Sequence, residues 1–138
     1  MDLTKRHRAY FKAARAVSEL SDFNRVKLGC VAVYGHRIIS TGCNSRKTNP
    51  LQKKYNIYRF DEDAGSHMLH AEIQCLLPLI GDKSIDFSKV SLYIYREFKN
   101  GGLAPAKPCP SCTQLIKDLG IKKVYYTGQG SYISETFV

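Results

Sequence analysis

Hydrophobic positions recur along this chain in short blocks that alternate between helical and strand-like spacing. Between residues 2 and about 20, apolar side chains return every three or four positions, which predicts an amphipathic helix that Asp2 or Thr4 could cap. Residues 28–34 and 37–43 are two apolar runs separated by a Gly-His pair, and they predict a β-hairpin. The N-terminal third is therefore expected to form a helix followed by two antiparallel strands.

The second half of the chain continues the alternation with two more predicted helices and three more strands. The helices are expected at 70–80 (or from Ser66) and 110–119, and the strands at 89–95, 121–127 and 132–138. Pro78 is costly inside a helix, so a kink or an early end is expected there. Too few residues separate the last two strands for a helical crossover, so those two strands must be antiparallel.

Two stretches lack regular periodicity and are expected to be long loops. Residues 45–66 begin with a basic segment in which Lys and Arg alternate with aromatic residues, and no acid occurs before Asp61. Such a segment either holds phosphates and stacks bases, or simply anchors a long loop to the core. Residues 96–107 contain a Gly-Gly pair and Pro105, and they could form a wall or lid over a bound substrate.

Length and composition favour one soluble globular domain that covers residues 1–138. The chain is 43% hydrophobic and 24% charged, and it has no apolar run of membrane-spanning length. Its N-terminal stretch is charged throughout, unlike a signal peptide, and its five cysteines are an odd number. A reduced, intracellular (cytoplasmic) setting is therefore expected. The net charge of +9 points toward phosphate-bearing partners, either nucleotides or polynucleotides.

A split motif carries the candidate chemistry. His70 is followed by Ala71 and Glu72; Cys109 comes 39 positions after His70, and Cys112 follows three positions later. One histidine and two cysteines with an open fourth position form a catalytic zinc site, whereas a structural site would have a fourth protein ligand. Pro110 suits the first turn of a helix, which places the cysteines at a helix N-terminus, where the dipole favours the metal-binding thiolate. Glu72 is close enough to His70 to handle the protons of a water without binding the metal.

This pattern, H-x-E followed by P-C-x-x-C, resembles that of the cytidine and deoxycytidylate deaminase superfamily. The resemblance implies a three-layer α-β-α fold with a five-stranded mixed sheet whose last strand is antiparallel. It also implies a Zn²⁺ cofactor and hydrolytic deamination at C4 of a cytosine, with Glu72 as the proton carrier. The loop at 96–107 departs from the nucleotide and tRNA adenosine deaminases, in which the third strand runs almost directly into the cysteine motif.

The resemblance and the basic segment also suggest substrate contacts. Asn44 occupies the place where the family has a pocket asparagine, although asparagine is equally common in turns. The backbone near Ala71 is expected to hold the base, as in the family. We also expect Arg46, Lys47 and Pro108 to contact the substrate.

Three functions are compatible with the sequence. The first is deamination of a free cytidine or deoxycytidine nucleotide, and the second is deamination of cytosine or adenine within single-stranded DNA or RNA. The third is a binding module without catalysis, in which His67 would complete a four-ligand structural zinc site with His70, Cys109 and Cys112. A homo-oligomer is compatible with all three, and no membrane partner is expected.

Overall fold

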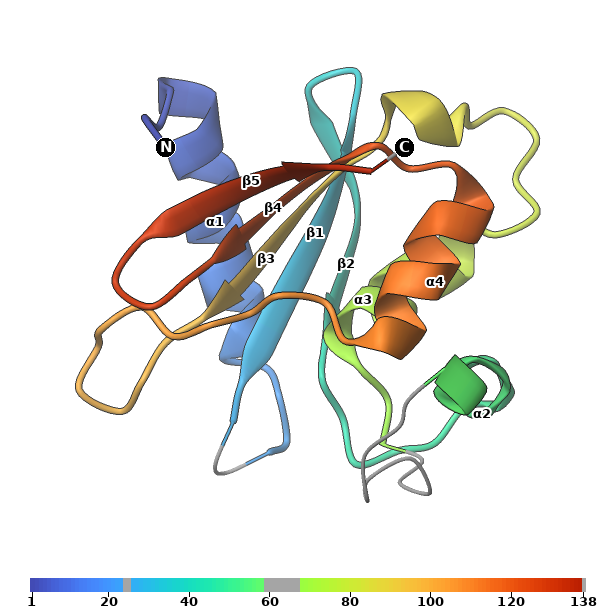
Figure 1. Cartoon of the computed structure of the whole chain (residues 1–138), viewed down its shortest axis with the longest axis horizontal. Coiled ribbons are helices and arrows are strands. Elements are labelled where there is room, and N and C mark those ends of the chain that lie inside the picture. Colours follow the sequence, from blue (N-terminus) through green and yellow to red (C-terminus); the bar gives the residue numbers. More distant parts are fainter. Residues whose placement is uncertain (24–25, 59–67, 138) are drawn as a thin grey trace.

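A computed structural model describes residues 1–23, 26–58 and 68–137 of the chain. A five-stranded sheet, with strand order β2-β1-β3-β4-β5, lies between α1 on one face and α3 and α4 on the other (Figure 1). This arrangement confirms the expected three-layer α/β fold with a mixed sheet. The proposed cap Ser66 and the alternative ligand His67 lie outside the described residues.

The elements have these bounds: α1 Lys5–Ser18, β1 Leu28–Tyr34, β2 Arg37–Cys43, α2 Pro50–Tyr55, the 3₁₀ helices η1 Asn56–Tyr58, η3 Leu77–Leu79 and η4 Phe87–Lys89, α3 Ala71–Leu76, β3 Ser91–Arg96, α4 Pro110–Leu119, β4 Lys123–Thr127 and β5 Tyr132–Thr136. In the described part of the chain, no helix is both long enough and apolar enough to cross a membrane.

The strand pairing agrees with the sequence prediction. β1 and β2 form the expected hairpin, and β1 also pairs antiparallel with β3. β3 and β4 are parallel, and α4 lies in the connection between them. β5 turns straight back on β4 and pairs antiparallel, as the short connection required. Because β3 lies inside the sheet with helices on both faces, its four central residues are buried.

The first helix covers one face of the sheet. Thr4 is its N-cap, and its side chain accepts a hydrogen bond from the backbone N–H of His7, whose ring accepts one from the Thr4 backbone in return. Phe11 and Ala14 pack against Val31 and Tyr93 in the apolar layer between helix and sheet. The remaining face of α1 is exposed and basic.

The opposite face carries the larger core, which α3 and α4 cover. Ile73 and Leu76 of α3 and Leu115 and Ile116 of α4 are buried against the sheet. The backbone of α3 lies against β2 at Gly42, where a Cβ atom would clash with the Cys75 nitrogen and lie 2.5 Å from the Ala71 carbonyl oxygen. Glycine at this position therefore fixes how closely the helix that follows His70 approaches the sheet.

Substitution of Gly42 by alanine is expected to lower the free energy of unfolding by about 3 kcal/mol or more, because the new methyl group meets backbone atoms that cannot rotate away. Urea denaturation followed by circular dichroism measures the change. Gly102→Ala is the control, since the nearest neighbours of its Cβ would be side-chain atoms, the Asn100 amide oxygen at 3.1 Å and the Phe98 ring at 4.0 Å, and no backbone atom. Equal stability of the two variants would contradict the close packing of α3 on β2.

Two segments differ from the sequence prediction. Part of the expected loop at 45–66 is helical: α2 begins at Pro50, and the Asn49 side chain caps it by accepting a hydrogen bond from the Leu51 N–H. The helix expected at 70–80 is α-helical only to Leu76 and continues as the 3₁₀ helix that contains Pro78. The early end at the proline was expected, whereas the capped turn at Asn49-Pro50 was missed.

Candidate metal centre and active-site pocket

The two helices that frame the site begin at residues of the split motif. His70 is the N-cap of α3, and Cys109 is the N-cap of α4; neither side chain makes a capping hydrogen bond. Pro110 occupies the first position of α4, as predicted, so Cys112 lies in the first turn above Cys109. His70 was expected within the first turn of its helix and instead lies just before it. Both N-cap side chains point to a common centre instead of capping their own helices.

The three predicted ligands come together at that centre. The Nδ1 atom of His70 lies 3.4 Å from the Sγ of Cys109 and 3.3 Å from the Sγ of Cys112, and the three atoms lie within 4.8 Å of one another. With zinc bond lengths of about 2.3 Å to sulfur and 2.0 Å to nitrogen, tetrahedral geometry separates nitrogen and sulfur ligands by about 3.5 Å. The arrangement therefore fits a zinc ion with little rearrangement.

The two thiols differ in acidity. The hydrogen bond with Cys112, together with His70, lowers the pKa of Cys109 to about 3, against the opposing effect of burial. The same sulfur–sulfur hydrogen bond and complete burial raise the pKa of Cys112 well above its usual value. The shared hydrogen bond thus favours a thiolate at Cys109 and a protonated thiol at Cys112. Zinc binding requires both thiolates and releases that proton.

Glu72 lies in the first turn of α3, beside the metal centre. Its side chain is only 4% exposed and shares a hydrogen bond with Cys112. Burial raises the pKa of this carboxyl above its ordinary value, although the charge of His70 acts in the opposite direction. A raised pKa makes the carboxylate a stronger proton acceptor than an ordinary glutamate, which suits a general acid–base catalyst.

A chain of buried polar groups supports His70 from behind. The Gln52 side chain accepts a hydrogen bond from the His70 backbone N–H at 2.9 Å and donates one to the Asn56 side-chain oxygen at 2.8 Å. The Ser111 hydroxyl of α4 donates to the same Asn56 oxygen at 3.2 Å. Gln52 and Ser111 are fully buried. This network links α2 and η1 to the N-termini of both ligand-bearing helices.

Sequence reasoning placed Gln52 and Asn56 in an irregular loop and gave them no role. The usable signal was Asn49-Pro50, an N-cap followed by a proline at the first helical position, which predicts a short helix here. On such a helix, residues four apart such as Gln52 and Asn56 lie on the same face.

Replacing Gln52 by leucine is expected to destabilise the protein by about 1–3 kcal/mol, because the His70 backbone N–H then loses the buried Gln52 side chain as its hydrogen-bond acceptor. It is also expected to weaken zinc binding about tenfold, as removal of groups that orient metal ligands does. Urea denaturation and a competitive zinc titration measure the two effects. Gln114→Leu, on the outer face of α4, is the control. Unchanged zinc affinity of Gln52→Leu would remove Gln52 from the metal site.

A pocket of about 340 Å³ opens at this centre, a volume at the lower end of the range for small-molecule sites. Its lining includes His70, Ala71, Glu72 and Cys109, so two of the three predicted metal ligands and the predicted catalytic carboxyl face one cavity, whereas Cys112 is not among the described lining residues. Most of its wall is apolar; the other lining residues are Phe23, Val26, Leu28, Asn44, Met68, Leu69, Arg96, Pro105, Ala106 and Lys107.

The remaining predicted contact residues divide into two groups. Asn44 lines the pocket, and its side chain also fixes the wall: it donates to the Val26 carbonyl at 2.7 Å and accepts from the Leu28 N–H at 3.0 Å. Arg46, Lys47 and Pro108 are not among the described residues that line the pocket. Their contact with a substrate stays a prediction from sequence.

Arg96 and Lys107 are the pocket cations that sequence reasoning did not single out. They stand at the two ends of the loop at 96–107, which was expected to form a wall, and Pro105 and Ala106 of this loop do line the pocket. Their place in the pocket was missed because the sequence of a long loop does not show that its first and last residues line the same cavity.

Comparison with known proteins gives consistent results. A family model described as the cytidine and deoxycytidylate deaminase zinc-binding region matches residues 4–128. A cytidine deaminase from Burkholderia pseudomallei has a similar fold, with a TM-score of 0.66 and 21% identity over 97% of this chain and 93% of that one. A search of curated protein sequences finds no match.

A dCMP deaminase from the cyanophage S-TIM5 is also similar. Its apo structure gives a TM-score of 0.61 and 27% identity over 91% of this chain and 84% of that one. Its complex with dCMP and dUMP gives a TM-score of 0.61 and 25% identity over 91% and 83% of the two chains.

Proposed function

The chain belongs to the cytidine and deoxycytidylate deaminase family, and on this premise we propose that it removes the amino group of cytosine from a cytidine or deoxycytidine nucleotide by zinc-dependent hydrolysis. One observation carries the proposal. The buried carboxyl of Glu72 lines the same pocket as His70 and Cys109, so a base in that pocket lies beside both the proton carrier and the metal ligands.

The residues that would hold zinc are His70, Cys109 and Cys112, whose nitrogen and sulfur atoms have the spacing that a tetrahedral zinc site requires. A zinc ion with three protein ligands supplies Lewis-acid activation of water. Proton transfer and the exclusion of water from the base are left to the side chains of the pocket.

Deamination of cytosine consumes one water, forms a C4–oxygen bond, and releases ammonia as the C4–nitrogen bond breaks. Both protons of the water must therefore be moved, one to ring atom N3 and one to the departing amino group. Glu72 is the described carboxyl that lines the pocket, and its raised pKa suits it to receive the first proton and pass it on. The apolar wall, including Phe23 and Leu28, shields the base from bulk water.

The cyanophage dCMP deaminase, whose structure was determined with dCMP and dUMP, supports a nucleotide as the substrate. A second candidate is deamination of a base within single-stranded DNA or RNA, which the net charge of +9 favours. Adenine deamination uses the same metal and glutamate and belongs to this second candidate.

Ammonia release from the zinc-loaded protein tests the proposal. The panel consists of cytidine, deoxycytidine, their monophosphates, adenosine and short single-stranded DNA and RNA oligonucleotides. Release from the mononucleotides with conversion to the uridine form is the expected result. Release from oligonucleotides alone would favour the second candidate, and no release from any of them would overturn both.

A further inference from the structure

We propose that Arg96 and Lys107 form a clamp for the 5′-phosphate of the substrate, so that this pocket selects nucleoside monophosphates over nucleosides. The proposal rests on the proposed function and names the residues that would set its substrate class. Both side chains line the pocket that contains Glu72. Lys107 is exposed and Arg96 half-exposed, whereas Glu72 is buried, so the two cations lie toward the open side and the catalytic carboxyl at the base.

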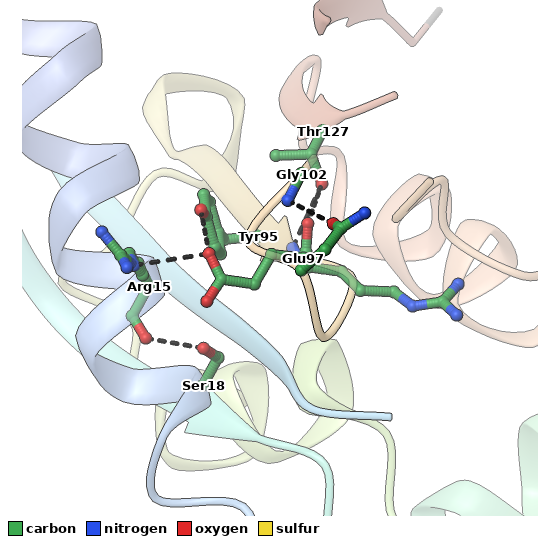
Figure 2. Close-up of polar contacts among 8 residues, drawn as sticks. Arg15, Ser18, Tyr95, Glu97, Gly102 and Thr127 are labelled. Carbon is green, nitrogen blue, oxygen red and sulfur yellow. Dashed lines mark hydrogen bonds and ion pairs between the residues drawn. The ribbon is translucent and has the colours of Figure 1, made fainter. Parts of the chain in front are cut away.

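These two positive charges are available to an anion. Within the described residues, neither Arg96 nor Lys107 forms an ion pair with an acid; the ion pair found there joins Arg15 to Glu97. The acidic residue of the loop, Glu97, is thus held on the α1 side, where it contacts Arg15 at 3.5 Å and accepts a hydrogen bond from Tyr95 at 2.7 Å (Figure 2). A phosphate monoester carries a charge of about −1.5 to −2 near pH 7 and would complement the positive charges of Arg96 and Lys107.

The loop is built so that its two ends stay together. The fully buried Thr127 hydroxyl accepts a hydrogen bond from the Arg96 N–H at 3.1 Å and donates one to the Ala104 carbonyl at 2.7 Å. Figure 2 shows the Thr127 hydroxyl beside the loop that follows β3. The Ala106 N–H donates to the Thr127 carbonyl at 2.8 Å, which fixes the residue just before Lys107.

A hydrogen bond to the loop backbone also holds the Arg96 side chain in place. Its Nη1 atom donates to the Pro105 carbonyl at 3.1 Å, and Pro105 lines the pocket. One edge of the guanidinium is therefore anchored to the pocket wall, and its other N–H groups can meet two phosphate oxygens. A guanidinium that is already oriented loses less conformational entropy when it binds an anion.

The positions of these cations favour a mononucleotide over a nucleic-acid strand. Both line the same pocket as Glu72, where the base would bind, so they are placed to meet the phosphate of the same nucleotide. Arg46 and Lys47, which were expected to contact the substrate, are not among the described residues of the pocket lining. The Arg46 guanidinium lies over the ring of Phe23, a residue of the pocket wall, at 5.8 Å from its centroid, and the Arg46 backbone N–H donates to Asp22.

The test compares cytidine with its 5′-monophosphate, and deoxycytidine with its own, in the zinc-loaded protein and in Arg96→Gln and Lys107→Gln. In the wild type, kcat/KM should be at least about a hundredfold higher for the monophosphates. Arg96→Gln should lower this ratio about 10- to 100-fold, and Lys107→Gln about 3- to 10-fold because that side chain is more exposed. Lys99→Gln, in the same loop but away from the described pocket lining, should keep the ratio.

Calorimetry measures the affinity for the products, uridine and its 5′-monophosphate, and so tests the clamp without turnover. If the wild type binds the monophosphate more tightly than uridine, and Arg96→Gln abolishes this difference, the clamp is supported. If the same result is obtained but no substrate is deaminated, the proposed function fails and the clamp stands. Equal affinity for both products, or a ratio unchanged by Arg96→Gln and Lys107→Gln, overturns the clamp and leaves deamination intact. Turnover of oligonucleotides in place of monophosphates also overturns it, in favour of a strand-binding site.

Discussion

Glutamine in place of Glu72 is expected to reduce kcat/KM for cytosine deamination by about 10³-fold or more while the protein keeps its fold and its zinc. Glutamine has nearly the same shape as glutamate but cannot accept and return a proton, and a positioned acid–base group contributes about 10²- to 10⁴-fold. Zinc content should stay unchanged because the predicted ligands are His70, Cys109 and Cys112. Steady-state kinetics, metal analysis and thermal unfolding on the same preparations provide the measurements.

Glu19→Gln is the matched control, since Glu19 lies exposed at the end of α1 and away from the described pocket lining. Its activity should equal that of the wild type. Measurable turnover by Glu72→Gln close to the wild-type level would remove Glu72 from its role as proton carrier. Loss of zinc in that variant would instead make the carboxylate a ligand, which contradicts the open three-ligand site.

Substitution of Cys109 by alanine is expected to reduce bound zinc from about one ion per chain to less than about a tenth, and to abolish activity with it, because three ligands with one open position leave no spare donor. Unfolding should also occur at a lower temperature, since metal binding contributes to folding free energy. Metal analysis of protein purified under reducing conditions, together with calorimetry, tests both effects. Treatment of the wild type with a strong chelator should reproduce the loss.

Cys43→Ala is the control for general effects of removing a thiol. Cys43 lies half-buried on β2 and outside the His70, Cys109, Cys112 group, so its removal should leave zinc and activity in place. A Cys109→Ala protein that retains a full zinc ion would indicate that other donors complete the site, as in the structural-site hypothesis with His67.

The local elements were predictable because they depend on neighbouring residues. The hairpin bounds 28–34 and 37–43 and the helix at 110–119 agree with the structure, since turn chemistry, an N1 proline and a C-terminal glycine act within a few residues. Gly120 ends α4 in the left-handed conformation, with a φ of 88°, which glycine adopts without strain. The antiparallel pairing of the last strand followed from the short connection between the last two strands. The metal motif was predictable because zinc chemistry restricts the residue types that serve as ligands.

The surroundings of the site depended on contacts that no local pattern contains. Gln52 supports His70 from a helix 18 residues earlier in the sequence, and the role of Gly42 appears only where β2 meets the backbone of α3. Arg96 and Lys107 reach the same pocket because Thr127, on β4, ties the ends of a loop together. The sequence by itself determined which atoms could hold a metal and move a proton. The tertiary structure decided which cations, walls and supporting amides surround them, because hydrogen bonds and packing between distant segments place those side chains.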